Sequence, residues 1–313
     1  MAKIRRNDAP YYIQKIQTNV KPEPSEPAAE EKVTEEVPEE EPAREQETEQ
    51  KTEPDKKPKE KKHSKGNIAY TVAMAVCLIV FLVSGGILVK RYFDDRQAEN
   101  EFADLQSMID PNAQATTSGE SNSAKFAALR EKNSDFIGWI SIENTSLDFP
   151  VMYAPDNKDF YLRHNFYKEY SVYGVPYLDE KTTLGANDQS ENLVIYGHNM
   201  KTGTIFGCLT GYKDASYYSE HPYIDFDTVY GDGQYEVFAA FSIDVVEDTS
   251  FVYNQYIDMD ESTYNAYVDE VIKRSDVDSG IRPSYGEQLL TLSTCEYSSD
   301  NGRYVVVARR VED

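Results

Sequence analysis

The stretch that decides the fold is LLTLSTC (residues 289–295), which the seven residues EYSSDNG separate from RYVVVA (residues 303–308). Both runs are β-rich, and the polar segment between them contains a glycine, which is the pattern of a β-hairpin. Pairing of the two strands brings Cys295 and Arg303 alongside each other at the mouth of the hairpin. A cation beside a thiol favours the nucleophilic thiolate and can also stabilise an oxyanion.

Further β-rich runs recur between turn residues across the C-terminal part of the chain. They lie at residues 139–142, 147–153, 174–178, 192–196 and 235–245. Together with the hairpin they make seven or eight short strands, which indicates a mainly β fold, either a barrel or a sandwich.

Two helices accompany these strands. The longer one, at about residues 261–274, precedes the 289–295 strand and follows Asp260, a suitable N-cap. Its apolar residues share one helical face. They are Tyr264, Tyr267, Val268, Val271 and Ile272. A short helix is expected over about residues 124–131, where a folded domain of about 190 residues begins, large enough for one core.

The chain carries 32 basic and 55 acidic residues, a formal charge of −23. A nucleic-acid partner is therefore not expected, because strong binders supply Lys and Arg to displace counterions from the phosphates. The three Cys cannot form a disulfide scaffold or a four-Cys zinc site, so no metal is expected. Residues 1–66 sum to only −2, which leaves −21 for the other 247 residues.

The N-terminal segment, residues 1–66, is rich in Pro and Glu and ends in a run of six Lys. It has almost nothing apolar to offset the entropy of ordering, so it is expected to be a disordered tail. The acidic part reads as a flexible tether, and the basic strip is expected to lie on anionic lipid.

Residues 68–89 contain no charged side chain, and these 22 residues, at about 1.5 Å each, cover the roughly 30 Å hydrocarbon layer of a bilayer. We predict a single transmembrane helix at residues 67–90, in preference to a buried core helix or a cleaved signal peptide. The six Lys before it place the N-terminus in the cytoplasm and the C-terminal part outside. Residues 91–122 are expected to form an extracellular stalk or linker, helical at first and then polar.

Among the four His, one lies in the same context as Cys295. His198 follows the apolar strand at residues 193–196 and a glycine, whereas His63 lies in the Lys run. His164 and His221 lie in polar, loop-like surroundings. An imidazole at a strand end can exchange protons near neutral pH with a thiol or an amine, so His198 is the candidate acid and base.

Three segments together resemble the catalytic signatures of sortases, the membrane-anchored cysteine transpeptidases of Gram-positive bacteria. They are YGHNM (196–200), TLSTC (291–295) and GRYVVVARR (302–310). Further similarity in DFIGWISIENTSLDFPVMY (135–153) and GVPYLDE (174–180) extends the resemblance over roughly residues 123–313. The sequence looks most like class B, which is similar in its N-terminal helices and in its long helix before the Cys strand.

The resemblance implies a closed, roughly eight-stranded barrel whose groove admits a sorting signal of the Leu/Asn-Pro-x-Thr-Gly/Asn type on surface proteins. Cys295 would attack the Thr carbonyl to form a thioester, His198 would move protons, and Arg303 would hold the signal backbone and the oxyanion. An amine of a lipid-linked cell-wall precursor or of a pilin would take the acyl group. A thioester conserves the bond energy, so no cofactor is needed, and the chain shows no nucleotide-binding motif.

Six further residues are expected to line the signal-binding groove, some by adjacency to the trio and some by the resemblance. They are Asn157, Leu162, Tyr196, Ser293, Thr294 and Glu296. Ser293 and Thr294 also fit as ordinary strand residues, and Cys208 fits better as a buried filler than as a second nucleophile. We interpret the acidity of the outer domain as an adaptation that keeps it soluble in a polyanionic wall. Attraction to cationic partners and a calcium-tuned loop are the alternatives.

Two other functions remain as alternatives at this point. A hydrolytic cysteine protease uses the same side chains, but the sequence motif that surrounds the Cys in papain-like enzymes is missing. A silent barrel that only scaffolds surface proteins would not need all three positions of the Cys, His and Arg trio to be occupied.

Overall fold

The structure is a computed structural model, and it describes residues 65–113, 122–297 and 299–311. The predicted tail at residues 1–66 lies outside the described residues, except for Lys65 and Gly66, which begin helix α2. The chain divides into two compact units, whose described parts are residues 65–92 and residues from Phe93 onward. Each unit is described by itself.

Helix α2 (Lys65–Gln106) contains the predicted membrane-spanning segment. By length and composition, the part from Tyr70 is long and apolar enough to cross a membrane, and its most apolar stretch is not buried in the protein. Phe81, for example, is 73% exposed. A core helix of a soluble domain would bury one face, so this exposure favours the predicted membrane-spanning segment over a core helix.

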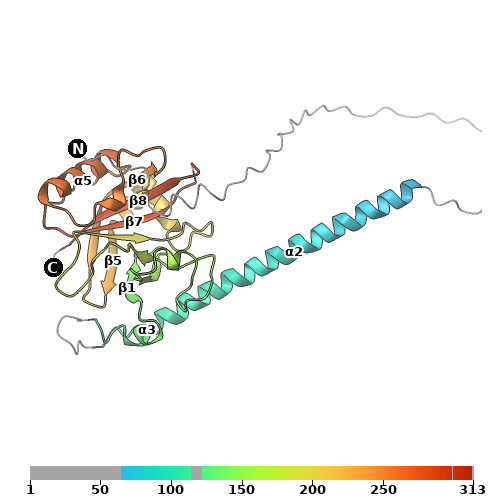
Figure 1. Cartoon of the computed structure of the whole chain (residues 1–313), viewed down its shortest axis with the longest axis horizontal. Helices are drawn as coiled ribbons and strands as arrows, with labels where there is room; N and C mark the ends of the chain where they lie inside the picture. The colour runs from blue at the N-terminus through green and yellow to red at the C-terminus, as the bar shows by residue number, and fades with distance from the viewer. Residues whose placement is uncertain (1–64, 114–121, 298, 312–313) are drawn as a thin grey trace, which may run out of the picture. The chain divides into compact units, whose positions relative to one another are not determined.

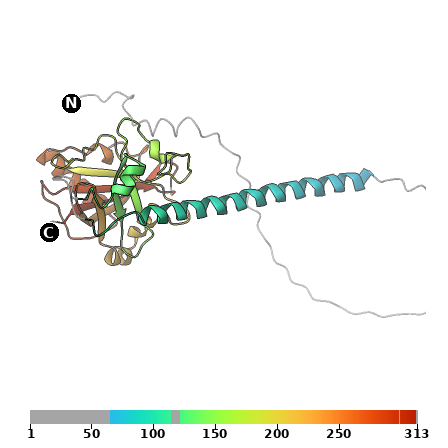
Figure 2. The same cartoon turned by 90° about the horizontal axis from the view of Figure 1, so that it is seen from below.

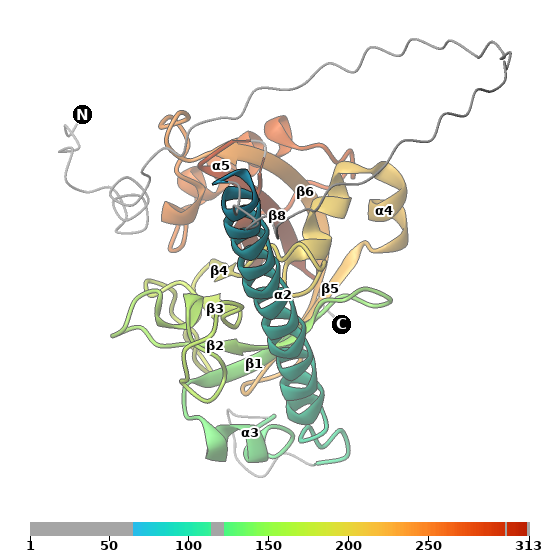
Figure 3. The ribbon, with the colours of Figure 1, turned by 90° about the vertical axis from the view of Figure 1, so that its right-hand side faces the viewer.

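The second unit is built on a closed barrel of eight strands in the order β1-β2-β3-β4-β7-β8-β6-β5. The strands are β1 (Phe136–Ser141), β2 (Asp148–Met152), β3 (Tyr177–Leu178), β4 (Asn192–Tyr196), β5 (Tyr223–Thr228), β6 (Gln234–Asp244), β7 (Leu289–Cys295) and β8 (Gly302–Arg310). Figure 3 shows β1 to β4 side by side, and Figure 2 shows the barrel from a second direction. Closure confirms the barrel and excludes the sandwich, and it leaves no open sheet edge.

Strand β5 was not among the predicted strands. Its burial alternates, with Ile224, Phe226 and Thr228 pointing inward, so a period-2 signal was present. Asp225 and Asp227 occupy the other face and break the apolar run that marks the other strands. β5 closes the barrel by pairing with both β1 and β6.

Short helices and one long helix surround the barrel. The short ones are α3 (Ala127–Lys132), α4 (Ala215–Glu220) and the 3₁₀ turns η1 (Phe160–Leu162), η2 (Gly207–Lys213) and η3 (Tyr253–Gln255). Helix α5 (Glu261–Arg274) lies near β6, β7 and β8 (Figure 1), and its N-cap is Asp260, which accepts the Thr263 amide at 2.8 Å, as predicted. The predicted apolar face was right except at Ile272, which is 36% exposed.

The core has two clusters, one centred on the barrel interior and one between α5 and the outer faces of β6 and β8. The interior cluster also includes Leu105, which is fully buried, and the Phe102 ring meets Phe149 edge-on at 4.8 Å. The stretch 91–122, expected to be a stalk or linker, therefore contributes a helical segment to the packed body. The polar surroundings of Leu105 in the sequence gave no sign of this packing.

Leu292 should carry a large share of the stability of the C-terminal end of β7. It is fully buried, and it pairs in register with Ile195 on β4 and Val306 on β8. We expect Leu292→Ala to lower the free energy of unfolding by about 3 kcal/mol, because the cavity adds to the lost transfer free energy. Urea denaturation followed by the fluorescence of Trp139, the single Trp, measures this change.

Val172→Ala is the control for this measurement. Val172 is 46% exposed, so its truncation should change the free energy of unfolding by less than about 0.5 kcal/mol. An equal loss in the two variants would contradict the importance of Leu292.

Candidate active site

The barrel gathers the three predicted catalytic residues at one end. β4 and β7 are parallel, with Tyr196 opposite Ser293, so His198 and Cys295 each lie two residues further along in the same direction. β7 and β8 are antiparallel, and Cys295 is in register with Arg303. The predicted hairpin and its register are thus confirmed, although the chemical roles of these residues are not tested by the geometry alone.

Four hydrogen bonds tie the loop that carries His198 to the end of β7. The Gly197 amide donates to the Ser293 carbonyl at 3.1 Å, and the Thr294 hydroxyl donates back to the Gly197 carbonyl at 2.8 Å. Asn199 Nδ2 donates to the Cys295 carbonyl at 2.9 Å, and the Tyr297 hydroxyl donates to the Asn199 carbonyl at 2.7 Å. These bonds fix the backbone on both sides of His198 against the backbone on both sides of Cys295.

The His198 ring is oriented by a backbone carbonyl. Its Nε2 lies 2.8 Å from the carbonyl oxygen of Leu162, the last residue of η1. A carbonyl only accepts, so Nε2 must carry a hydrogen, and Nδ1 is left as the nitrogen that can gain or lose a proton. The fold thus selects one tautomer of the half-buried imidazole.

Arg303 is almost fully buried at 6% exposure, and its Nη1 donates to the Gly302 carbonyl at 2.8 Å. Tyr253 on η3 lies near it, and its hydroxyl is 2.7 Å from the hydroxyl oxygen of Ser293. Burial raises the pKa of Tyr253, while Arg303 opposes the rise and Cys295 adds to it. Tyr253 is therefore within electrostatic reach of both the guanidinium and the thiol.

A second set of contacts fixes Tyr196, two residues before His198. Its hydroxyl donates to Asp179 at 2.7 Å and accepts from Asn254 Nδ2 at 2.9 Å. Burial raises the pKa of Asp179, although the hydrogen bonds from the Lys181 amide and from Tyr196 oppose the rise. The chain segment around η3 is thus bonded to both strands that lead into the site.

The other predicted groove residues take different positions. Ser293 and Thr294 are buried at 2% exposure and use their hydroxyls on protein partners. Asn157 is exposed and borders a small hollow that Tyr177 also lines, and Tyr177 packs against Tyr196 with ring centroids 5.5 Å apart. Asn157 and Leu162 therefore flank the β4 side of the site.

Glu296 follows the thiol and is bound to η2. Its carboxylate pairs with Lys213 Nζ at 3.0 Å, and its side chain is only 11% exposed. Its amide donates to the Gly302 carbonyl at 3.0 Å, which closes the hairpin mouth behind Cys295 and Arg303. Gly302 permits this approach, because a Cβ there would lie 2.5 Å from the Glu296 carbonyl oxygen.

Sequence reasoning missed four residues that shape this site: Tyr253, Asn254, Asp179 and Asn199. Asn199 lies within the YGHNM segment, so it was within reach. Tyr253 and Asn254 lie in an irregular segment between β6 and α5, and no periodic pattern marks which of its side chains turn inward.

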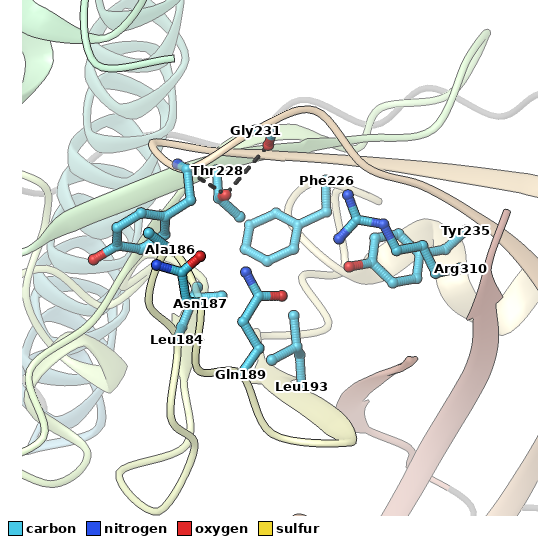
Figure 4. Close-up of a pocket in the computed structure, with 11 residues that line it drawn as sticks. Leu184, Ala186, Asn187, Gln189, Leu193, Phe226, Thr228, Gly231, Tyr235 and Arg310 are labelled. Atoms are coloured by element: carbon cyan, nitrogen blue, oxygen red, sulfur yellow. Dashed lines mark hydrogen bonds between the residues drawn. The ribbon is translucent and has the colours of Figure 1, made fainter. Parts of the chain in front are cut away.

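A separate polar cavity of about 400 Å³ lies at the other end of the same strands. Leu193 on β4 and Arg310 on β8 line it, at the ends opposite to those that approach His198 and Cys295. Figure 4 shows Gln189 and Arg310 directed into this hollow. Because it is separated from the thiol by the length of the barrel, it is not the cleft in which Cys295 acts.

Comparisons with known proteins decide the family. The family model of the sortase domain matches residues 140–311, which contain the three residues gathered at the barrel end. The chain belongs to the sortase family. It is a cysteine transpeptidase of class B, as the sequence resemblance indicated.

Two relatives of similar sequence are class B sortases. Sortase B of Staphylococcus aureus (strain NCTC 8325 / PS 47) is 29% identical over 240 residues, which cover 75% of this chain and 93% of that protein. Sortase B of Listeria monocytogenes serovar 1/2a is 29% identical over 235 residues, which cover 74% of this chain and 92% of that protein.

Solved structures agree with these relatives. Sortase B from B. anthracis in complex with AAEK1 superposes with a TM-score of 0.62 at 26% identity, covering 71% of this sortase and all of that chain. The Staphylococcus aureus sortase B–substrate complex gives 0.60 at 27% identity, covering 70% of this sortase and 99% of that chain.

Gly197 should be required to hold His198 in place. A Cβ at this position would lie 2.7 Å from the buried Phe206 ring, and the Phe206 amide donates to the His198 carbonyl at 3.0 Å. We expect Gly197→Ala to displace the His198 loop and to lower kcat/KM for cleavage of a sorting-signal peptide by at least about tenfold. Adding Phe206→Leu makes room for the methyl group and should restore part of the activity. No loss in the single variant would show that the loop position does not matter.

Proposed function

We propose that this sortase cleaves a sorting signal of the Leu/Asn-Pro-x-Thr-Gly/Asn type after Thr and transfers the acyl group to an amine of a cell-wall precursor or a pilin. The observation that carries this proposal is the register of β4, β7 and β8. It brings a thiol, an imidazole and a buried guanidinium to one end of a rigid barrel. Acyl transfer needs these three groups as nucleophile, proton carrier and oxyanion stabiliser.

In the first half-reaction, Cys295 attacks the Thr carbonyl carbon of the signal. The C–S bond forms, and the C–N bond to the following residue breaks. The departing amine takes a proton from His198 Nδ1, since Nε2 is held by the Leu162 carbonyl. Arg303 lies next to Cys295 and balances the negative charge on the carbonyl oxygen during this step.

In the second half-reaction, an acceptor amine attacks the thioester. The new C–N bond forms, the C–S bond breaks, and His198 takes the proton from the amine. The sulfur returns to Cys295 as a thiolate, so the enzyme is regenerated without an external energy source. The choice between an amine and water as acceptor separates a transpeptidase from a protease.

The predicted groove residues have two kinds of role in this proposal. Tyr196, Leu162 and Asn157 form the wall on the β4 side, and Glu296 borders the thiol. Ser293 and Thr294 are buried and support the groove indirectly. Ser293 hydrogen-bonds to Tyr253, and Thr294 donates to the Gly197 carbonyl. Their buried hydroxyls fix the shape of the groove.

We further propose that α2 anchors the enzyme in the cell membrane, with the N-terminus in the cytoplasm and the barrel outside. The length and apolar composition of α2 support the anchor, and the Lys run before it supports the orientation. Substrates that are themselves inserted in the membrane then share one surface with the enzyme.

Replacement of the trio tests the chemistry. We expect Cys295→Ala to abolish cleavage and transfer, because no other group supplies the nucleophile. His198→Ala and Arg303→Ala should each lower kcat by about 10²- to 10⁴-fold but leave measurable activity. Release of the C-terminal peptide fragment, followed by mass spectrometry, measures the first half-reaction. An active Cys295→Ala enzyme would contradict the mechanism.

Product analysis tests the acceptor. With hydroxylamine or triglycine present, we expect the Thr hydroxamate or the Thr-triglycine adduct to exceed the free acid. If only the free acid forms, the enzyme is a hydrolytic protease. If no peptide of a signal library is cleaved, the barrel is a scaffold.

Tyr196→Phe tests the groove wall. The change removes the hydroxyl that bonds to Asp179 and Asn254 and leaves the ring in place. We expect KM for the signal peptide to rise by about three- to tenfold with little change in kcat, because one or two hydrogen bonds that fix the wall are lost. Steady-state kinetics measures both constants. A fall in kcat at constant KM would place Tyr196 in the chemical step instead.

A further inference from the structure

A second cavity lies between the C-terminal part of α2 and the loop at residues 199–206. Its volume is about 220 Å³, and it lies entirely within the unit that begins at Phe93. Phe102 from α2, Phe149 from β2 and Ile205 from the loop form its apolar walls. It is distinct from the polar cavity of Figure 4, with which it shares no lining residue.

The charge around this cavity is negative. Asp95, Glu99 and Asp148 line it, and none of its lining residues, all of them in the described part of the chain, is basic. Asp95 accepts a hydrogen bond from Tyr173. Asp148 accepts one from the Trp139 indole at 2.5 Å and one from the Gln106 side-chain amide, so both carboxylates are fixed in position. Carboxylates beside aromatic faces attract an ammonium group by charge and by cation–π contact.

The cavity wall is connected to the active site by two contacts. Ile205 forms an isolated β-bridge with Asn199, and Asn199 Nδ2 donates to the Cys295 carbonyl at 2.9 Å. The Ser146 hydroxyl donates to the Gly203 carbonyl at 2.6 Å and holds the far side of the loop. The loop that borders the cavity therefore begins directly after His198.

Under the proposed anchoring by α2, the cavity lies near the bilayer surface. Asp95 follows Val89, the last residue of the uncharged stretch, by only six residues. Even fully extended, six residues reach at most about 20 Å. A membrane-inserted acceptor carries its head group within about the same 20 Å of the bilayer, so the head group can reach the cavity.

We infer that this cavity, which we name the acceptor pocket, binds the ammonium-bearing peptide of a membrane-bound acceptor next to the thioester. The inference rests on the proposed function and names the place from which its second substrate approaches. The carboxylates bind the ammonium form and raise its local concentration. The ammonium loses one proton to solvent as it leaves the carboxylates. The neutral nitrogen then attacks the thioester: the C–N bond forms, the C–S bond breaks, His198 takes the second proton from the nitrogen, and the sulfur leaves as the Cys295 thiolate.

Two substitutions in the full-length enzyme test the pocket. Glu99→Gln removes one charge at an exposed rim position whose ion pair with Arg96, at 3.8 Å, is also exposed. Ala98→Leu fills the cavity without a change of charge. Asp104→Asn is the matched control, since Asp104 is an exposed acid on the same helix and does not line the pocket.

The measurement is the KM for triglycine as acceptor, compared with the rate of fragment release and with the KM for hydroxylamine. We expect Glu99→Gln to raise the triglycine KM by about threefold and Ala98→Leu by about tenfold. Hydroxylamine is small and mostly neutral, so its KM should stay within about twofold. Asp104→Asn should match the wild-type enzyme in all three quantities.

The outcomes separate the two proposals. If wild-type enzyme releases the fragment and forms the adduct, but the triglycine KM is the same in all variants, the cavity is a packing gap and the inference is wrong. If triglycine and hydroxylamine KM rise together, the variants have disturbed the His198 loop, and the inference is again wrong. If wild-type enzyme releases no fragment, the proposed function itself fails.

Discussion

The pairing of β7 with its two neighbours is the constraint on which the rest of the structure depends. The parallel ladder with β4 brings His198 to the end of the barrel that Cys295 occupies, and the antiparallel ladder with β8 sets Arg303 opposite Cys295. A shift of one residue in either ladder would turn the side chains to the other face. The core side chains of β7, including the fully buried Leu292, make such a shift costly, so the burial of apolar strands also fixes the geometry of the candidate site.

The paired strands set the positions of the site residues, and hydrogen bonds from buried polar groups then set the orientations of their side chains. Tyr253 and Asn254 bond to the residues two positions before Cys295 and His198, and the Leu162 carbonyl selects the His198 tautomer. Each buried donor or acceptor left unpaired would cost about 1–3 kcal/mol, so these bonds specify one arrangement of the groove. A rigid site of this kind holds the reacting groups before the substrate arrives.

Short sequence patterns predicted the elements whose formation depends on neighbouring residues in the chain. The hairpin, the His198 strand end and the α5 cap follow from apolar runs, turn residues and a capping side chain. The strand pattern left a barrel or a sandwich open, and the closed barrel was predicted from the resemblance to sortases. Strand β5 was missed because its two outward Asp residues interrupt the apolar run. The inward turn of Tyr253 and the burial of Leu105 depend on contacts between segments far apart in the sequence, and no short pattern encodes such contacts.

The helix around Leu105 bears on the proposed anchoring of the barrel to the membrane. A flexible stalk would let the barrel sample a large volume, and the effective concentration of membrane-bound substrates would fall with its length. Packing of Phe102 and Leu105 on the barrel makes this part of the chain a section of the folded body instead of a free stalk. Under the proposed anchoring by α2, the enzyme and its membrane-bound substrates share one thin layer, and weak binding of each substrate then supports turnover. An enzyme held in this way is better served by fast release than by tight binding, because uniform binding energy does not increase kcat.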